Sequence, residues 1–206
     1  DGLGHIGDDD IFYNCNKGSD FSYITGLTKF GIEKIPPLVG RGVLVNMAKY
    51  FDIISMEGGQ GITRENIQEA AKDQNINFKK GDIILFHTGW TDAKLKASPE
   101  EWGSTIPGIT NDAAIYLASL QPMAVGADTW GLGAVPPIAG DKVYYDHVTL
   151  IKENGIYILE TMNTGKLASD NVSEFMFVLG QPKIKGAVQM IINPVALWWV
   201  LFVFYF

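Results

Sequence analysis

The chain has 206 residues, of which 47% are hydrophobic and 19% charged, and its formal net charge is −7. This length can bury one sizeable core, and the composition is that of a folded globular protein. No stretch is dense in lysine and arginine, which argues against nucleic acid as a partner. Cys15 is the one cysteine, so an internal disulfide framework is excluded. We expect a single domain.

The chain opens with Asp1 and His5, which are separated by a glycine-rich stretch. Carboxylate and imidazole groups are common ligands of divalent metals, and glycines let the backbone turn tightly enough to bring them together. The same stretch also matches G-x-G-x-x-G, the dinucleotide-binding pattern. That pattern needs a preceding strand, and here residues 8–10 are three aspartates that would repel a diphosphate. We therefore interpret the opening as part of a metal site.

Strands and helices alternate along the first half of the chain. An apolar run over residues 42–47 follows Pro36-Pro37 and predicts a buried strand. Thr63 is a suitable cap for a helix that continues to about Ala71. A short apolar run over residues 83–87 predicts the next strand, after a polar turn.

The second half continues this alternation. Thr110 or Asn111 can cap a helix that ends near residue 120, and residues 123–127 predict a strand that ends at Asp128. Residues 143–150 are compatible with either a strand or a helix. The pattern as a whole indicates one α/β or α+β domain.

The last elements are apolar. Asn154-Gly155 is a strong turn signal, and β-branched residues make 156–160 a strand behind it. Two further strands are predicted over residues 175–179 and 187–192. The final residues are almost entirely apolar, but an internal Asn-Pro pair and the absence of a lysine or arginine after the apolar stretch argue against a membrane span. We expect a last buried strand followed by an apolar tail.

The chain holds three histidines, His5, His87 and His147. His87 ends an apolar strand, where a hydrogen-bonded structural histidine is the commoner finding. His147 lies thirteen residues before Glu160, which closes another apolar strand. A carboxylate buried there needs a partner, and a metal ion would satisfy both groups. The spacing alone is weak support for such a pair.

Separate blocks along the whole chain carry a family resemblance. They are Asp1-Gly2-Leu3-Gly4-His5, Tyr13-Asn14, Gly31-Ile32-Glu33-Lys34-Ile35-Pro36-Pro37, Arg41-Gly42-Val43-Leu44, residues 81–90, Pro107-Gly108-Ile109, residues 125–130 and residues 154–160. In this order they resemble the cyclase family of metal-dependent hydrolases, which includes kynurenine formamidase (arylformamidase) and isatin hydrolase. Asp1 and His5 match the last Asp and last His of its signature H-x-G-T-H-x-D-x-P-x-H, with Leu3 in place of the proline.

The resemblance implies a cyclase-like domain over residues 1–197, followed by an apolar tail over 198–206. Its fold would be a mixed α/β, swivelling β/β/α arrangement, with a mixed sheet core flanked by helices. It also implies that Asp1, His147 and Glu160 are ligands of Zn²⁺ or Mn²⁺. His5 would be the general base, or a group that supports the metal ligands, beside a metal-activated water that attacks an amide carbonyl.

The implied substrates are small cyclic or N-formyl aromatic amides, of the arylformamidase or isatin hydrolase type, as in tryptophan catabolism through kynurenine. Phe12, Tyr13, Trp90 and Trp130 are candidate walls of the substrate site, whereas Asp128 is expected to organise its own loop. We expect a cytoplasmic protein that forms homodimers or homotetramers.

The signature begins before residue 1, which leaves two hypotheses open. The sequence is either a fragment of an active hydrolase or a complete protein that kept the fold and lost catalysis. In the second case it would serve as a binding or assembly module for a small aromatic ligand or a partner chain. The abrupt start inside the signature favours the fragment.

Overall fold

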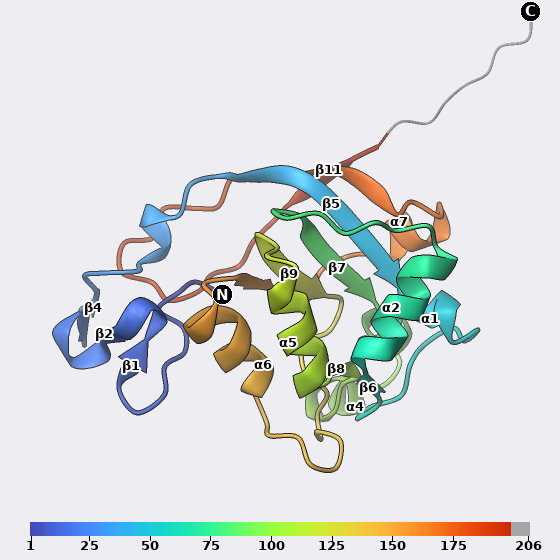
Figure 1. Ribbon diagram of the computed structural model, residues 1–206, viewed down its shortest axis with the longest axis horizontal. Coiled ribbons are helices and arrows are strands. Elements are labelled where there is room, and N and C mark those ends of the chain that lie inside the picture. Colours follow the sequence, from blue (N-terminus) through green and yellow to red (C-terminus); the bar gives the residue numbers. More distant parts are fainter. Residues whose placement is uncertain (199–206) are drawn as a thin grey trace, which may run out of the picture.

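The computed structural model describes residues 1–198, and its centre is a six-stranded mixed sheet (Figure 1). The strand order is β10-β9-β7-β5-β11-β12. The first four strands run parallel to one another, while β11 is antiparallel to β5, and β12 to β11. The strands are β5 (Leu38–Asn46), β7 (Ile83–His87), β9 (Ala124–Ala127), β10 (Tyr157–Leu159), β11 (Glu174–Leu179) and β12 (Val195–Leu197).

Helices cover both faces of this sheet. Figure 1 shows α2, α5 and α6 side by side over one face, and α7 packs on the other. This arrangement confirms the expected mixed α/β fold, a mixed sheet flanked by helices. The covering helices are α2 (Arg64–Asp73), α5 (Asn111–Ser119), α6 (Tyr145–His147), the π-helix η4 (Val148–Glu153) and α7 (Gly165–Ser169).

Shorter elements complete the described part of the chain. They include helices α1 (Met47–Tyr50), α3 (Trp90–Lys94) and α4 (Pro99–Ser104), the 3-10 helices η1 (Tyr13–Cys15), η2 (Gly18–Asp20) and η3 (Ile32–Lys34), and three small strand pairs. The pairs are β1 (Ile11–Phe12) with β2 (Asn16–Lys17), β3 (Ser22–Tyr23) with β4 (Gly26–Leu27), and β6 (Gly61–Ile62) with β8 (Gly108–Ile109).

The central strands are buried on both faces, which explains their continuous apolar sequences. Side chains alternate across a strand, so Ile84 and Phe86 pack with α2, α5 and η4, whereas Ile83 and Leu85 pack with Leu167 of α7. Each core layer therefore draws on every second residue of the same strand.

Local signals set the start of α2 as the sequence predicts. The hydroxyl of Thr63 accepts a hydrogen bond from the backbone nitrogen of Asn66 at 3.2 Å, and the Asn66 side chain accepts one from the Thr63 nitrogen at 3.0 Å. This reciprocal capping box satisfies donors that a helix N-terminus leaves free. The helix ends at Asp73, two residues beyond the predicted end.

Two expectations need correction or completion. The strand predicted over residues 187–192 is wrong, because the carbonyls of Ala187 and Val188 accept hydrogen bonds from the nitrogens of Ile32 (3.0 Å) and Gly2 (3.1 Å) instead of joining a sheet. The last strand, β12, comes later and is partly exposed rather than buried. Residues 143–150, which the sequence left undecided, contain α6 and the start of η4.

Within residues 1–198, no helix is long and apolar enough to cross a membrane. The apolar tail predicted over 198–206 lies outside the described residues, except for Trp198.

Candidate metal centre

Asp1 and His5 are held together beside the end of β10. The nitrogen of Asp1 donates a hydrogen bond to the carbonyl oxygen of Ile158 at 2.7 Å, which fixes Asp1 against the strand. The chain then turns, and the nitrogen of His5 donates to the carbonyl of Gly2 at 3.0 Å. As a result, His5 Nε2 lies 3.7 Å from Asp1 Oδ2.

Gly4, which lies between them, packs closely against Leu27. A Cβ atom at Gly4 would lie 2.3 Å from Cδ1 of Leu27, closer than carbon atoms can approach. A side chain at Gly4 would therefore require Leu27 to move, and glycine lets this turn pack closely against it.

His147 approaches the same point from α6. That helix begins after Tyr144, whose φ of 57° lies in the left-handed region. Asp146 and His147 follow and are both buried, with 3% and 4% of their surfaces exposed. The ring of Tyr144 stands edge-on to the imidazole of His147, with centroids 5.8 Å apart.

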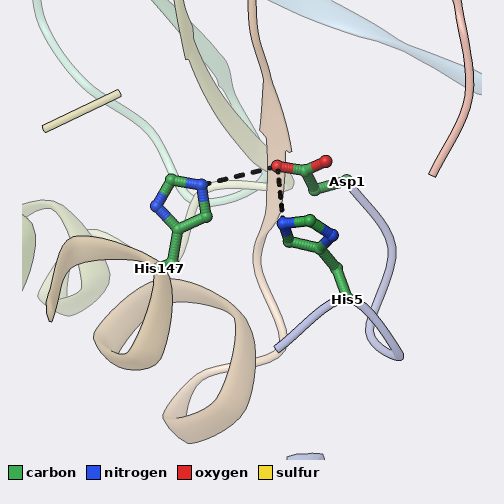
Figure 2. A group of neighbouring side chains, drawn as sticks. All are labelled: Asp1, His5 and His147. Atoms are coloured by element: carbon green, nitrogen blue, oxygen red, sulfur yellow. Dashed lines mark ion pairs between the residues drawn. The ribbon is translucent and has the colours of Figure 1, made fainter. Parts of the chain in front are cut away.

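Figure 2 shows how the three side chains converge on one carboxylate oxygen. Asp1 Oδ2 lies 3.5 Å from His147 Nε2, and one potential ligand atom from each of Asp1, His5 and His147 lies within 4.8 Å of the others. Glu160, immediately after β10, contacts the same histidine, with Oε1 3.1 Å from His147 Nε2. The structure thus brings together the four residues that the sequence nominates.

The two histidines have opposite electrostatic surroundings. Burial acts to lower the pKa of His147, but hydrogen bonds to Asp146 and Glu160 outweigh it and raise this pKa to about 9. Burial lowers the pKa of His5, and the nearby charge of His147 lowers it further. Without a metal, His147 is therefore a cation among carboxylates, while His5 is a neutral base.

These residues fit a divalent metal ion. Asp1 Oδ2 and His5 Nδ1 are buried and have no hydrogen-bond partner among residues 1–198. A buried carboxylate oxygen without a donor is costly, and a cation at this point would satisfy it. Carboxylate and imidazole donors together suit zinc or manganese.

A cavity of about 370 Å³ adjoins the centre through Glu160. Its volume lies in the usual range for a small-molecule site. Its lining is largely apolar and includes aromatic rings, with a few polar groups among them. The side chains that define it include Met162, Leu167, Phe175, Phe177 and Trp198, together with Asn163, Lys166 and Asn193.

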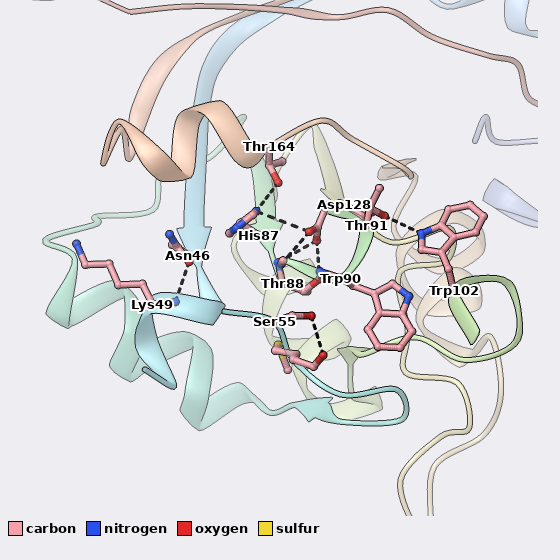
Figure 3. Close-up of polar contacts among 12 residues, drawn as sticks. Asn46, Lys49, Ser55, His87, Thr88, Trp90, Thr91, Trp102, Asp128 and Thr164 are labelled. Atoms are coloured by element: carbon pink, nitrogen blue, oxygen red, sulfur yellow. Dashed lines mark hydrogen bonds and ion pairs between the residues drawn. The ribbon is translucent and has the colours of Figure 1, made fainter. Parts of the chain in front are cut away.

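His87 belongs to a separate polar cluster, shown in Figure 3. Its Nδ1 lies 2.8 Å from the hydroxyl of Thr164, so His87 is hydrogen-bonded, as expected for a structural histidine. Asp128 accepts hydrogen bonds from the nitrogens of Thr88 and Gly89, both at 2.9 Å. Asp128 therefore organises the turn after β7, which corrects the expectation that it organises its own loop.

The four aromatic residues considered as substrate walls have partners inside the protein. Trp90 is buried with 1% of its surface exposed, and Trp130 donates from its indole nitrogen to the Trp102 carbonyl at 2.7 Å. Phe12 packs edge-on against Phe21, and Tyr13 packs against Phe30. The aromatic lining beside Glu160, which comes from β11 and the segment after β12, was missed because only the folded sheet assembles it.

Several solved structures are similar to this chain. A crystal structure of a novel cyclase is 27% identical with a TM-score of 0.85, and the match covers 96% of this chain and 66% of that one. Isatin hydrolase A from Labrenzia aggregata, bound to benzyl benzoate, is 19% identical with a TM-score of 0.60, over 84% of this chain and 67% of that one. A potential metal-dependent hydrolase with cyclase activity is 22% identical with a TM-score of 0.59, over 85% and 72%.

The chain therefore spans about two thirds of the length of the first of these proteins. No curated protein is a significant match. A family model described as "Putative cyclase" matches residues 1–134, which is more than half of the chain and includes Asp1 and His5. The chain belongs to the cyclase family.

Proposed function

We propose that this protein hydrolyses the C–N bond of a small cyclic or N-formyl aromatic amide, with a divalent metal ion held by Asp1, His147 and Glu160. The observation that carries the proposal is the buried Oδ2 of Asp1, which faces two imidazoles and has no hydrogen donor among residues 1–198. The fold shared with isatin hydrolase A and with a potential metal-dependent hydrolase supports this class of reaction.

The chain's own residues have distinct tasks in such a reaction. When bound, zinc or manganese supplies a Lewis acid that lowers the pKa of a water and polarises the carbonyl. His5 is neutral because burial lowers its pKa, so it can accept a proton from the attacking water. The His5 imidazolium formed in this way then donates the proton to the leaving nitrogen as the C–N bond breaks. Asp1, 3.7 Å from His5 Nε2, stabilises the protonated ring in between.

The cavity beside Glu160 supports an aromatic substrate. A fused or monocyclic aromatic amide is flat and apolar, and rings such as Phe175, Phe177 and Trp198 line this space. With the aromatic part in the cavity, the amide carbonyl would lie toward Glu160 and the metal ligands. We therefore propose that the cavity selects aromatic over aliphatic amides.

The test is a hydrolysis assay with isatin and N-formylkynurenine on the purified chain loaded with zinc or manganese. We expect turnover and about one metal ion per chain by elemental analysis, both lost in Asp1→Asn and His147→Ala. Asp82→Asn is the matched control, because Asp82 is also buried but pairs with Arg41 at 2.8 Å, away from the centre and its cavity. A metal-loaded chain that hydrolyses neither amide would contradict the proposal, and ligand binding without turnover would favour a binding module.

A further inference from the structure

We propose that Asp146 is a positioning residue that holds the ring of His147 so that Nε2 faces the metal centre. The inference rests on the metal site of the proposed function and concerns a residue outside that ligand set. It assigns Asp146 an effect on metal affinity exerted through His147, with no contact between Asp146 and the ion.

The two nitrogens of His147 point to different partners. Nδ1 lies 2.8 Å from Asp146 Oδ2, whereas Nε2 lies 3.1 Å from Glu160 Oε1 and 3.5 Å from Asp1 Oδ2. A ligand histidine gives the lone pair of one nitrogen to the metal and keeps its proton on the other. Asp146 accepts that remaining N–H and thereby fixes both the tautomer and the orientation of the ring.

The Asp146 carboxylate lies in a buried space beside a glycine and has His147 as its partner. Its carboxylate is buried, and the only hydrogen-bonded side chain it contacts among residues 1–198 is His147. A Cβ atom at Gly133 would lie 2.8 Å from Asp146 Oδ1, so the absence of a side chain there leaves room for the carboxylate. Neighbours in a helix normally point apart, which makes this direct contact between residues 146 and 147 a specific feature of the site.

Three variants test the idea through zinc affinity, measured by isothermal titration calorimetry. Asp146→Ala removes the acceptor and should weaken zinc binding about 10- to 100-fold, the range found for such outer partners of metal-bound histidines. Asp146→Asn keeps an oxygen acceptor without the charge and should recover part of this loss. Gly133→Ala keeps the carboxylate but displaces it, and should also weaken binding.

Asp82→Asn is the matched control. Asp82 is as deeply buried as Asp146, with 2% of its surface exposed, and pairs with Arg41 at 2.8 Å. It precedes β7, at the end of the parallel strands opposite to Glu160. Loss of a buried carboxylate there should lower stability and leave the zinc Kd unchanged.

A spectroscopic readout separates positioning from general destabilisation. In the zinc-loaded chain, imidazole ¹⁵N spectra should show His147 with a protonated Nδ1 and a ligating Nε2, and Asp146→Ala should add a second form with the nitrogens exchanged. If Asp146→Ala fails to fold by circular dichroism, Asp146→Asn and Gly133→Ala decide the question.

The outcomes distinguish the two proposals. Wild-type zinc affinity in the folded Asp146 and Gly133 variants would overturn the positioning role while leaving the metal site intact. A wild-type chain that binds no zinc would overturn both proposals. The expected loss of affinity in a chain that hydrolyses no amide would support the positioning role and refute only the proposed reaction.

Discussion

If His147 holds zinc as proposed, zinc and a proton would compete for the same nitrogen of its ring, so acidification should weaken zinc binding steeply. In the metal-free protein the carboxylates of Asp146 and Glu160 raise the pKa of His147 to about 9. A metal ligand must be deprotonated, so zinc has to displace one proton at any lower pH. Each pH unit below this pKa then costs about tenfold in apparent affinity, and a change from about pH 8 to about pH 6 costs about 100-fold, or about 3 kcal/mol.

Calorimetry in two buffers with different heats of ionisation measures both the zinc Kd and the number of protons released. We expect close to one proton per zinc ion from His147. His5 adds little to the pH dependence of the zinc Kd, because burial lowers its pKa. An equal zinc Kd at the two pH values, or binding without proton release, would refute the reasoning.

The stability of the metal-free chain should depend on the protonation of His147 as well. The pKa of His147 is raised from an ordinary 6.5 to about 9 in the folded state, so its proton stabilises the fold. This contribution is complete below pH 6.5 and is lost as the pH rises through about 9. The loss amounts to about 3 kcal/mol in the free energy of unfolding. Urea titrations of the wild type and of His147→Gln measure it, and the same decline in both would count against this origin.

Three further substitutions have definite expected effects. Phe86→Ala empties a fully buried core position between the sheet and its helices, and should lower the free energy of unfolding by about 3–5 kcal/mol in urea titrations. Asp128→Ala leaves the N–H groups of Thr88 and Gly89 without their acceptor, which should lower the free energy of unfolding by about 1–3 kcal/mol for each group. The metal content measured by elemental analysis should not change. Ala196→Trp fills the cavity beside Glu160 and should raise KM for aromatic amides in steady-state kinetics without changing bound metal.

Elements with local signals could be predicted from the sequence. Strand β7 coincides with the apolar run over residues 83–87, and α2 begins after the cap at Thr63. The segment over residues 187–192 has a strand-like composition too. Its backbone partners, Gly2 and Ile32, lie at the other end of the chain, and composition carries no information about so distant a pairing.

The candidate site, too, could be predicted only in part from the sequence. Family resemblance, and not spacing, nominated His147 and Glu160, since a separation of thirteen residues along the chain does not determine whether two side chains meet. The structure places them 3.1 Å apart. The contact of Asp146 with His147 was beyond prediction, because adjacent residues of a helix usually point in different directions.

The origin of the ligands at distant points of the chain has a consequence for folding. In the proposed centre, a metal ion bound by Asp1 and His147 would act as a cross-link that closes nearly three quarters of the polypeptide into one loop. Such a clip restricts the unfolded ensemble more strongly the longer the loop it closes. The ion would therefore also fasten the first residues to α6. Chelation should leave this segment held by its backbone hydrogen bonds alone, such as that from Asp1 to Ile158, so it should loosen before the sheet melts.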